Sequence, residues 1–193
     1  MSKPQALSAT KTLTSEALST TKTSVNALTY VTEKFTNAPP LTAMPRLAIK
    51  RHAKEKDLAT VLTGCYEDDT HIEYLGNMLV KYYKKKDQDN QSLWNVDCSR
   101  LNYIVRTVVG KKESWIADKK GIQLRSFVIE PLLENIKEEL SDYMKNPKSH
   151  NADNFLTLKF CIDLTKDIND NIVCEELVKF MAPHFQLDRT SKT

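Results

Sequence analysis

Five cations in one short span of the sequence are the residues best suited to bind a ligand. They are Lys111, Lys112, Lys119, Lys120 and Arg125. Ammonium and guanidinium groups attract phosphate oxygens, and a small hairpin flanked by helices would present them as a winged-helix DNA-binding protein does. The spacing therefore indicates a set of nucleic-acid contacts. Against it, the residues beyond position 54 sum to −3, whereas dedicated nucleic-acid binders are usually basic.

Cysteine and histidine, the other residues that do chemistry, are dispersed along the chain. The four cysteines are Cys65, Cys98, Cys161 and Cys174. They form no C-x2-C pair, so we expect free thiols rather than a disulfide framework or a zinc site. His71 follows Asp68 and Asp69 and could join them in a metal cluster. An Asp-Asp-Thr run before an apolar-periodic segment is more typical of a helix start, which we favour.

Catalytic motifs are absent from the sequence. It contains no glycine-rich phosphate loop, no nucleophile elbow and no H-E-x2-H pair. We therefore expect a protein that is not an enzyme and that uses no cofactor and no metal ion.

The first 54 residues differ from the rest in charge. They carry eight basic and two acidic residues, a net +6, while the whole chain carries +3. A basic arm is attracted electrostatically to acidic surfaces, on a partner protein, on nucleic acid or on an anionic membrane. A solvated tail is the simpler alternative.

An eleven-residue repeat in this arm would place apolar side chains on one stripe of a helix. Its members are Leu7, Leu18, Val25, Leu28 and Phe35. The stripe is thin and rich in Ser and Thr, so it should fold only when it packs on a partner. A membrane-surface helix would usually carry more bulky apolar and cationic residues. We therefore predict docking onto other proteins, in an oligomer or hetero-complex.

Prolines and hydrophobic periodicity divide the chain into three parts. Three prolines between residues 37 and 46 predict an extended linker, so we expect an arm and linker over 1–45, a helical domain over 46–187 and a tail over 188–193. Apolar residues at helical spacing predict helices over 46–62, 70–86, 152–168 and 170–181. With four glycines and few alternating runs, the predicted fold is mainly α, a compact helical domain with one small β-hairpin and an extended or partly helical N-terminal arm.

The segment between these helices carries the hairpin. Asp97 is a suitable N-cap for a helix over 98–109, with Gly110 as its stop. The run Asp118-Lys-Lys-Gly121 then predicts a tight turn between two short extended pieces. Pro131 is tolerated near the start of a following helix that extends to about residue 143.

The same segment resembles a known viral domain. The patterns L-W-x3-D-x2-R-L-x-Y-I, W-I-x-D-K-K-G and I-x-P-L-L-x2-I are similar to a domain of uncharacterised proteins from large nucleocytoplasmic DNA viruses. The resemblance covers roughly the second half of the chain, implies a viral source and carries over no catalytic residue. In those proteins the domain often follows a zinc-finger-like or coiled-coil segment, and this chain has no Cys/His finger there.

Two functions are compatible with these observations. The first is an assembly protein, such as a minor capsid protein or another structural component of a virion, that docks by its N-terminal arm. The alternative is a DNA-binding regulator that uses the helix–hairpin–helix segment. No apolar run is long enough to span a bilayer and no signal peptide opens the chain, so we expect synthesis in the host cytoplasm, with the virion as a further location.

Overall fold

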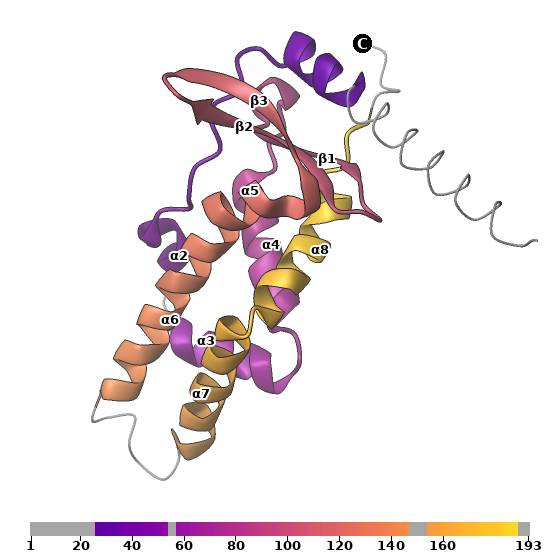
Figure 1. Ribbon diagram of the computed structural model, residues 1–193. Helices are drawn as coiled ribbons and strands as arrows, with labels where there is room; N and C mark the ends of the chain where they lie inside the picture. Colours follow the sequence, from indigo (N-terminus) through magenta and orange to yellow (C-terminus); the bar gives the residue numbers. More distant parts are fainter. Residues whose placement is uncertain (1–25, 54–56, 147–153, 189–193) are drawn as a thin grey trace, which may run out of the picture.

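The computed structural model describes residues 26–53, 57–146 and 154–188 (Figure 1). Residues 26–34 are helical. The other helices are α2 (Arg46–His52), α3 (Leu58–Glu67), α4 (His71–Tyr83), α5 (Ile122–Leu124), α6 (Glu130–Lys145), α7 (Phe155–Asn169) and α8 (Ile172–His184), and the strands are β1 (Leu93–Asp97), β2 (Asn102–Val109) and β3 (Lys112–Asp118). The predicted mainly α class is confirmed, with a three-stranded antiparallel sheet where one hairpin was expected.

Five helices form the body of the domain, and the longest of them, α6, packs against α3 and α7. In Figure 1, α3 and α7 lie side by side at the end farthest from the sheet, and α4 runs from there toward the sheet beside α8. Leu75, Met78 and Leu79 of α4 are buried in the main hydrophobic core. The predicted helices over 70–86, 152–168 and 170–181 correspond to α4, α7 and α8. The start of α4 at His71 confirms that Asp68 and Asp69 precede a helix.

Two helix boundaries differ from the expectation. The helix predicted over 46–62 is two helices, and α3 begins anew because the Asp57 carboxylate caps it by accepting the Thr60 N–H at 3.0 Å. The last helix, predicted over 170–181, extends to His184 and contains Pro183 in its last turn.

The sheet replaces the helix that was predicted over 98–109. β2 occupies most of that range and pairs with β1 and β3 in antiparallel register. The run Asn102–Val109 is rich in β-branched residues, and its apolar positions fit helical spacing as well as a strand buried on both faces. Asp97 caps a tight turn instead, because its carboxylate accepts the Ser99 hydroxyl at 2.7 Å and the Arg100 N–H at 3.1 Å.

The hairpin turn was also predicted in the wrong place. It lies at Gly110 and Lys111 between β2 and β3, where Gly110 has a φ of +66°. The run Asp118 to Gly121 leads from β3 into α5 instead. Both carboxylate oxygens of Asp118 accept backbone N–H groups of that helical segment, from Gln123 at 2.9 Å and Leu124 at 3.0 Å. Turn-forming residues therefore begin a helix here.

The predicted arm and linker also need correction. Residues 26–38 cover one face of the sheet, where Phe35 stacks on Trp94 and the Trp115 Nε1–H donates to the Phe35 carbonyl at 3.0 Å. Leu41 and Met44, inside the predicted linker, are buried in the main core. The prolines prevent a helix there, but an extended segment can still pack. A domain that begins at residue 46 would therefore lack part of its own core.

Candidate anion-binding site

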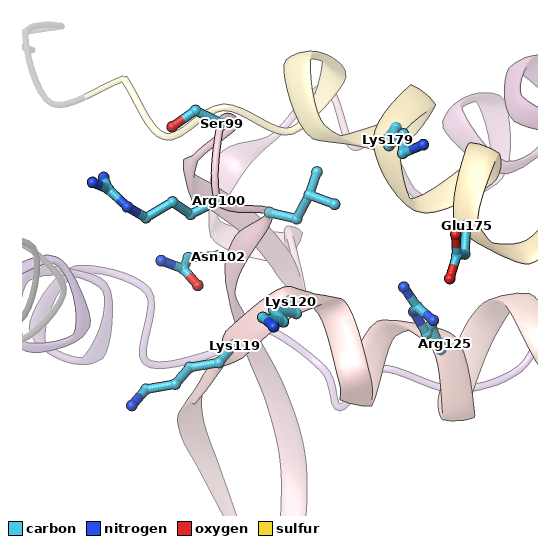
Figure 2. Close-up of a pocket in the computed structure, with 9 residues that line it drawn as sticks. Ser99, Arg100, Asn102, Lys119, Lys120, Arg125, Glu175 and Lys179 are labelled. Atoms are coloured by element: carbon cyan, nitrogen blue, oxygen red, sulfur yellow. The ribbon is translucent and has the colours of Figure 1, made fainter.

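A pocket of about 470 Å³ lies between the sheet and α8 (Figure 2). Its charged lining consists of Arg100, Lys119, Lys120, Arg125, Lys179 and the single carboxylate Glu175. Ser99 and Asn102 add a hydroxyl and an amide. The charged groups give the pocket a net +4, whereas the whole chain carries +3, so all remaining residues together sum to −1. The pocket is therefore a second basic region of the protein, separate from the basic first 54 residues.

The structure brings together three of the five predicted cations. Lys119, Lys120 and Arg125 line the pocket, whereas Lys111 and Lys112 lie at the tip of the β2–β3 hairpin, at the other end of β3. Arg100 and Lys179 complete the pocket and were not predicted. They come from the β1–β2 turn and from α8, and no sequence signal links positions so far apart.

Uncommon backbone conformations position the lining residues. Leu101 and Lys120 both have positive φ, at 53° and 58°, although L-residues other than glycine rarely adopt it. Arg125 begins the π-helical turn Arg125–Ile129, and such turns interrupt α-helices frequently at functional sites. Figure 2 shows Arg125 pointing toward Glu175, while Arg100 and Lys119 both extend to the left of the view, away from Arg125. Three strained or irregular positions thus line one pocket, which is typical of a binding site.

Asp118 fixes the backbone of the segment that follows Lys119 and Lys120. Burial raises the pKa of Asp118, and the backbone N–H groups of residues 122–124 partly oppose that rise. Because the carboxylate occupies these N–H groups, the start of α5 is not free to bind an anion. A ligand of the pocket must therefore be held mainly by side chains.

Three of the pocket cations form no ion pair with the described residues, although the Arg125 charge partly opposes the burial that raises the pKa of nearby Asp118. Within the described part of the chain, the side chains of Lys119, Lys120 and Arg125 form neither an ion pair nor a hydrogen bond, and the Arg125 Nε is buried. The other two are paired, Arg100 with Asp97 at 3.0 Å and Lys179 with Glu176 at 2.7 Å. Burial alone would raise the pKa of Asp97, but hydrogen bonds from Ser99 and Arg100 bring it below the usual value. The unpaired cations are the ones that a ligand could neutralise.

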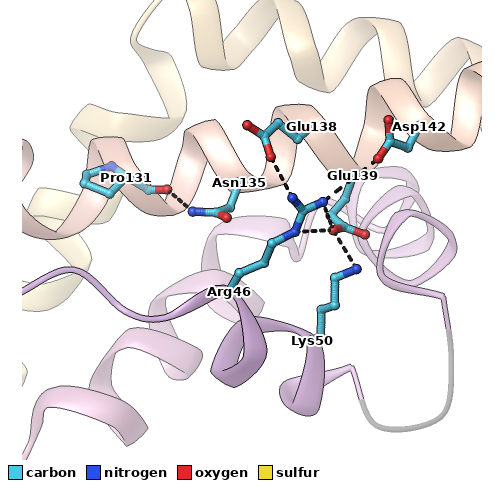
Figure 3. A network of polar contacts seen from close by, with 7 residues as sticks. All are labelled: Arg46, Lys50, Pro131, Asn135, Glu138, Glu139 and Asp142. Carbon is cyan, nitrogen blue, oxygen red and sulfur yellow. Dashed lines mark hydrogen bonds and ion pairs between the residues drawn. The ribbon is translucent and has the colours of Figure 1, made fainter.

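A second cation cluster is paired within the fold (Figure 3). Arg46 of α2 contacts Glu138 at 2.8 Å and Glu139 at 2.6 Å, and Lys50 contacts Glu139 at 3.0 Å. This α2–α6 network joins two helices and leaves no excess positive charge.

The predicted partner stripe of the arm is only partly described. Phe35 is 1% exposed and Leu28 packs against the same small core, so these two contact the chain's own sheet rather than a surface open to a partner. Leu7, Leu18 and Val25 lie outside the described residues. Docking through them stays a prediction.

Comparison of the chain with models of protein families, with curated proteins and with solved structures found no match. Within residues 26–53, 57–146 and 154–188, no helix has both the length and the apolar character of a membrane span. In the same ranges, no three His, Cys, Asp or Glu side chains gather as a metal site. Cys161 and Cys174 are buried free thiols, and burial raises the pKa of both.

Proposed function

We propose that the protein binds the phosphate backbone of nucleic acid through the pocket lined by Arg100, Lys119, Lys120, Arg125 and Lys179. One observation carries the proposal, the presence of five cations from four separate segments of the chain around one pocket that holds a single carboxylate. Three of them are unpaired in the described part of the chain, so binding would not require an existing ion pair to break.

The lining favours recognition of phosphates over recognition of bases. It contains no aromatic side chain on which an unstacked base could lie. The Asn102 amide can donate to phosphate oxygens, as amide groups commonly do in protein–DNA complexes, whereas the Ser99 hydroxyl already donates to Asp97 at 2.7 Å. Binding should therefore depend little on sequence and strongly on salt.

Fluorescence anisotropy with a labelled DNA duplex tests this proposal. Changing Lys119→Glu together with Lys120→Glu should abolish measurable binding at moderate salt. In low salt, neutral replacements of the same two lysines should reduce the slope of log affinity against log salt by about 2, because each neutralised phosphate contributes about 0.9.

A matched control is the double change Lys159→Glu and Lys166→Glu. Both lysines are exposed on α7, so the change in net charge is the same but falls on another part of the protein. Equal loss of binding in both double variants would indicate a general charge effect and contradict the proposal.

Protein assembly remains a second candidate function. It is favoured by a separate feature, the outer edge of β3, whose backbone groups have no partner among the described residues and are open to a partner strand. The viral resemblance and a place in the virion stay predictions, which copurification of the protein with particles would test.

A further inference from the structure

The outer side of β3 has no backbone partner in the part of the chain that the structure describes. β3 is a terminal strand in the order β1-β2-β3. No backbone hydrogen bond within the described ranges reaches its outer groups. The other terminal strand is covered, because the Asn95 N–H donates to the Phe185 carbonyl at 2.7 Å and the Leu187 N–H donates to the Asn95 carbonyl at 2.8 Å. The sheet thus has one covered and one open edge.

The register identifies the outward groups. A two-residue turn joins Val109 and Lys112, so their pair exchanges hydrogen bonds and every second pair after it does the same. The N–H and C=O groups of Glu113, Trp115 and Ala117 therefore point away from β2. The neighbouring strand agrees with this alternation. Arg106 lies opposite Trp115 in the register. The Arg106 N–H donates to the Ser92 carbonyl, and the Arg106 carbonyl accepts from the Leu41 N–H, so both groups point away from β3.

The outer edge of β3 lacks the features that usually prevent an edge strand from pairing with another chain. Between Ser114 and Ala117 it has no charge, no proline and no bulge. Glu113, at its start, is ion-paired with Arg106 at 3.2 Å. An exposed lysine pair stands at each end, Lys111 and Lys112 before the strand and Lys119 and Lys120 after it. The nearer members, Lys112 and Lys119, are seven residues apart, which is roughly 24 Å at about 3.4 Å per strand residue.

We propose that the outer edge of β3 binds an extended segment of a partner protein, with acidic residues at both ends of that segment and an uncharged, β-forming centre. Alternating backbone donors and acceptors match an extended peptide, and the two lysine pairs match its acidic ends. A second copy of this chain fits less well. Antiparallel self-pairing about Trp115 would bring the lysine pairs of opposite ends together, and like charges opposed across strands are destabilising.

Amide hydrogen exchange, followed by NMR on the full chain, tests the geometry directly. The probe is a synthetic peptide with alternating valine and threonine in its centre and two acidic residues at each end. In the free protein, the amides of Glu113, Trp115 and Ala117 should exchange quickly, while those of Ser114 and Ile116, bonded to β2, exchange slowly. The acidic peptide should slow the first set, and a peptide with lysine ends should not.

A pair of variants separates backbone pairing from charge. Ala117→Pro removes one outward donor and no bond to β2, so it should weaken binding of the acidic peptide about tenfold. Ala117→Ser keeps that donor and should bind like the natural chain. Neither change alters charge, so duplex binding at the pocket should persist in both.

Three results would overturn the proposal. The first is equal binding of the lysine-ended peptide. The second is slow exchange of the outward amides in the free monomer, because another part of the chain would then cover the edge. The third is a dimer in solution that protects those amides, because a second copy would then be the occupant.

Discussion

The two cation clusters of this protein differ in how their charge is neutralised. In the α2–α6 network, Arg46 and Lys50 contact carboxylates of a neighbouring helix (Figure 3). In the pocket, Lys119, Lys120 and Arg125 have no such partner in the described part of the chain (Figure 2). The network uses its charges to join helices. The pocket keeps unpaired like charges close together, and their mutual repulsion opposes folding.

Backbone geometry follows the same division. Residues of the network lie on regular helices, whereas the pocket contains Leu101 and Lys120 in left-handed conformations and the π-helical turn at Arg125. We therefore expect substitutions in the network to reduce stability without changing binding, and substitutions in the pocket to reduce binding without reducing stability.

The largest expected effect tests whether the pocket depends on the packing of the sheet. Trp115 is 6% exposed, lies at the middle of β3 and donates to the Phe35 carbonyl. Trp115→Ala should lower the free energy of unfolding by about 3–5 kcal/mol and weaken duplex binding with it. Denaturant unfolding measures the first effect. If stability fell and anisotropy still reported full affinity, the pocket would not depend on the Trp115 anchor.

The sequence predicts a structural feature of this protein well where neighbouring residues determine it, and poorly where residues distant in the sequence do. The helix at 71–83 follows from its apolar stripe, and the buried role of Trp115 follows from its residue type. β2 was mistaken for a helix because Leu101, Ile104, Val105 and Val108 are at helical spacing, while a strand buried on both faces shows no alternation, and only pairing with β1 and β3 identifies it. Arg100 and Lys179 join the pocket through tertiary contacts, which no local pattern reports.

A pH-dependent effect on stability is expected at His71, which belongs to neither cation cluster. His71 is 9% exposed, its ring lies 4.8 Å from that of Tyr66, and its Nδ1 has no partner in the described part of the chain. Burial lowers the pKa of His71, which outweighs the opposing effect of Asp69 and Asp167.

Because the pKa in the fold is below that of the unfolded chain, this contribution to stability is present above about pH 6.5 and is lost as pH falls. A single proton limits the slope to about 1.4 kcal/mol per pH unit. Unfolding of the natural chain and of His71→Gln should differ in slope between about pH 7 and 5. Identical slopes would show that His71 contributes nothing to the pH dependence.

A smaller effect is expected at the strained lysine of the pocket. Lys120→Gly should raise stability by up to about 1 kcal/mol, because relief of the left-handed conformation exceeds the entropic cost of glycine. The salt slope of duplex binding should fall by about 0.9. Lys119→Gly is the matched control. It removes the same charge, but Lys119 is not among the residues with positive φ, so it should weaken binding without a gain in stability.

The smallest expected effect is in the network. Glu139 accepts hydrogen bonds from Arg46 and contacts Lys50, but Arg46 is 43% exposed, so solvent screens the interaction. Glu139→Gln should cost at most about 1 kcal/mol. Burial alone would raise the pKa of Glu139, and the bonds from Arg46 and Lys50 lower it overall. The stabilisation is therefore present above the ordinary glutamate pKa and is lost as pH falls through the lower pKa of the fold.

The control for this change is Glu134→Gln. It lies on the same helix and contacts only Lys137, at 2.7 Å, from a side chain that is 67% exposed, so its loss should have no measurable effect on unfolding. Duplex affinity should be unchanged in both variants, because neither residue lines the pocket. Reduced affinity in Glu139→Gln alone would mean that the α2–α6 network supports the anion site, and the division between paired structural cations and unpaired binding cations would then fail.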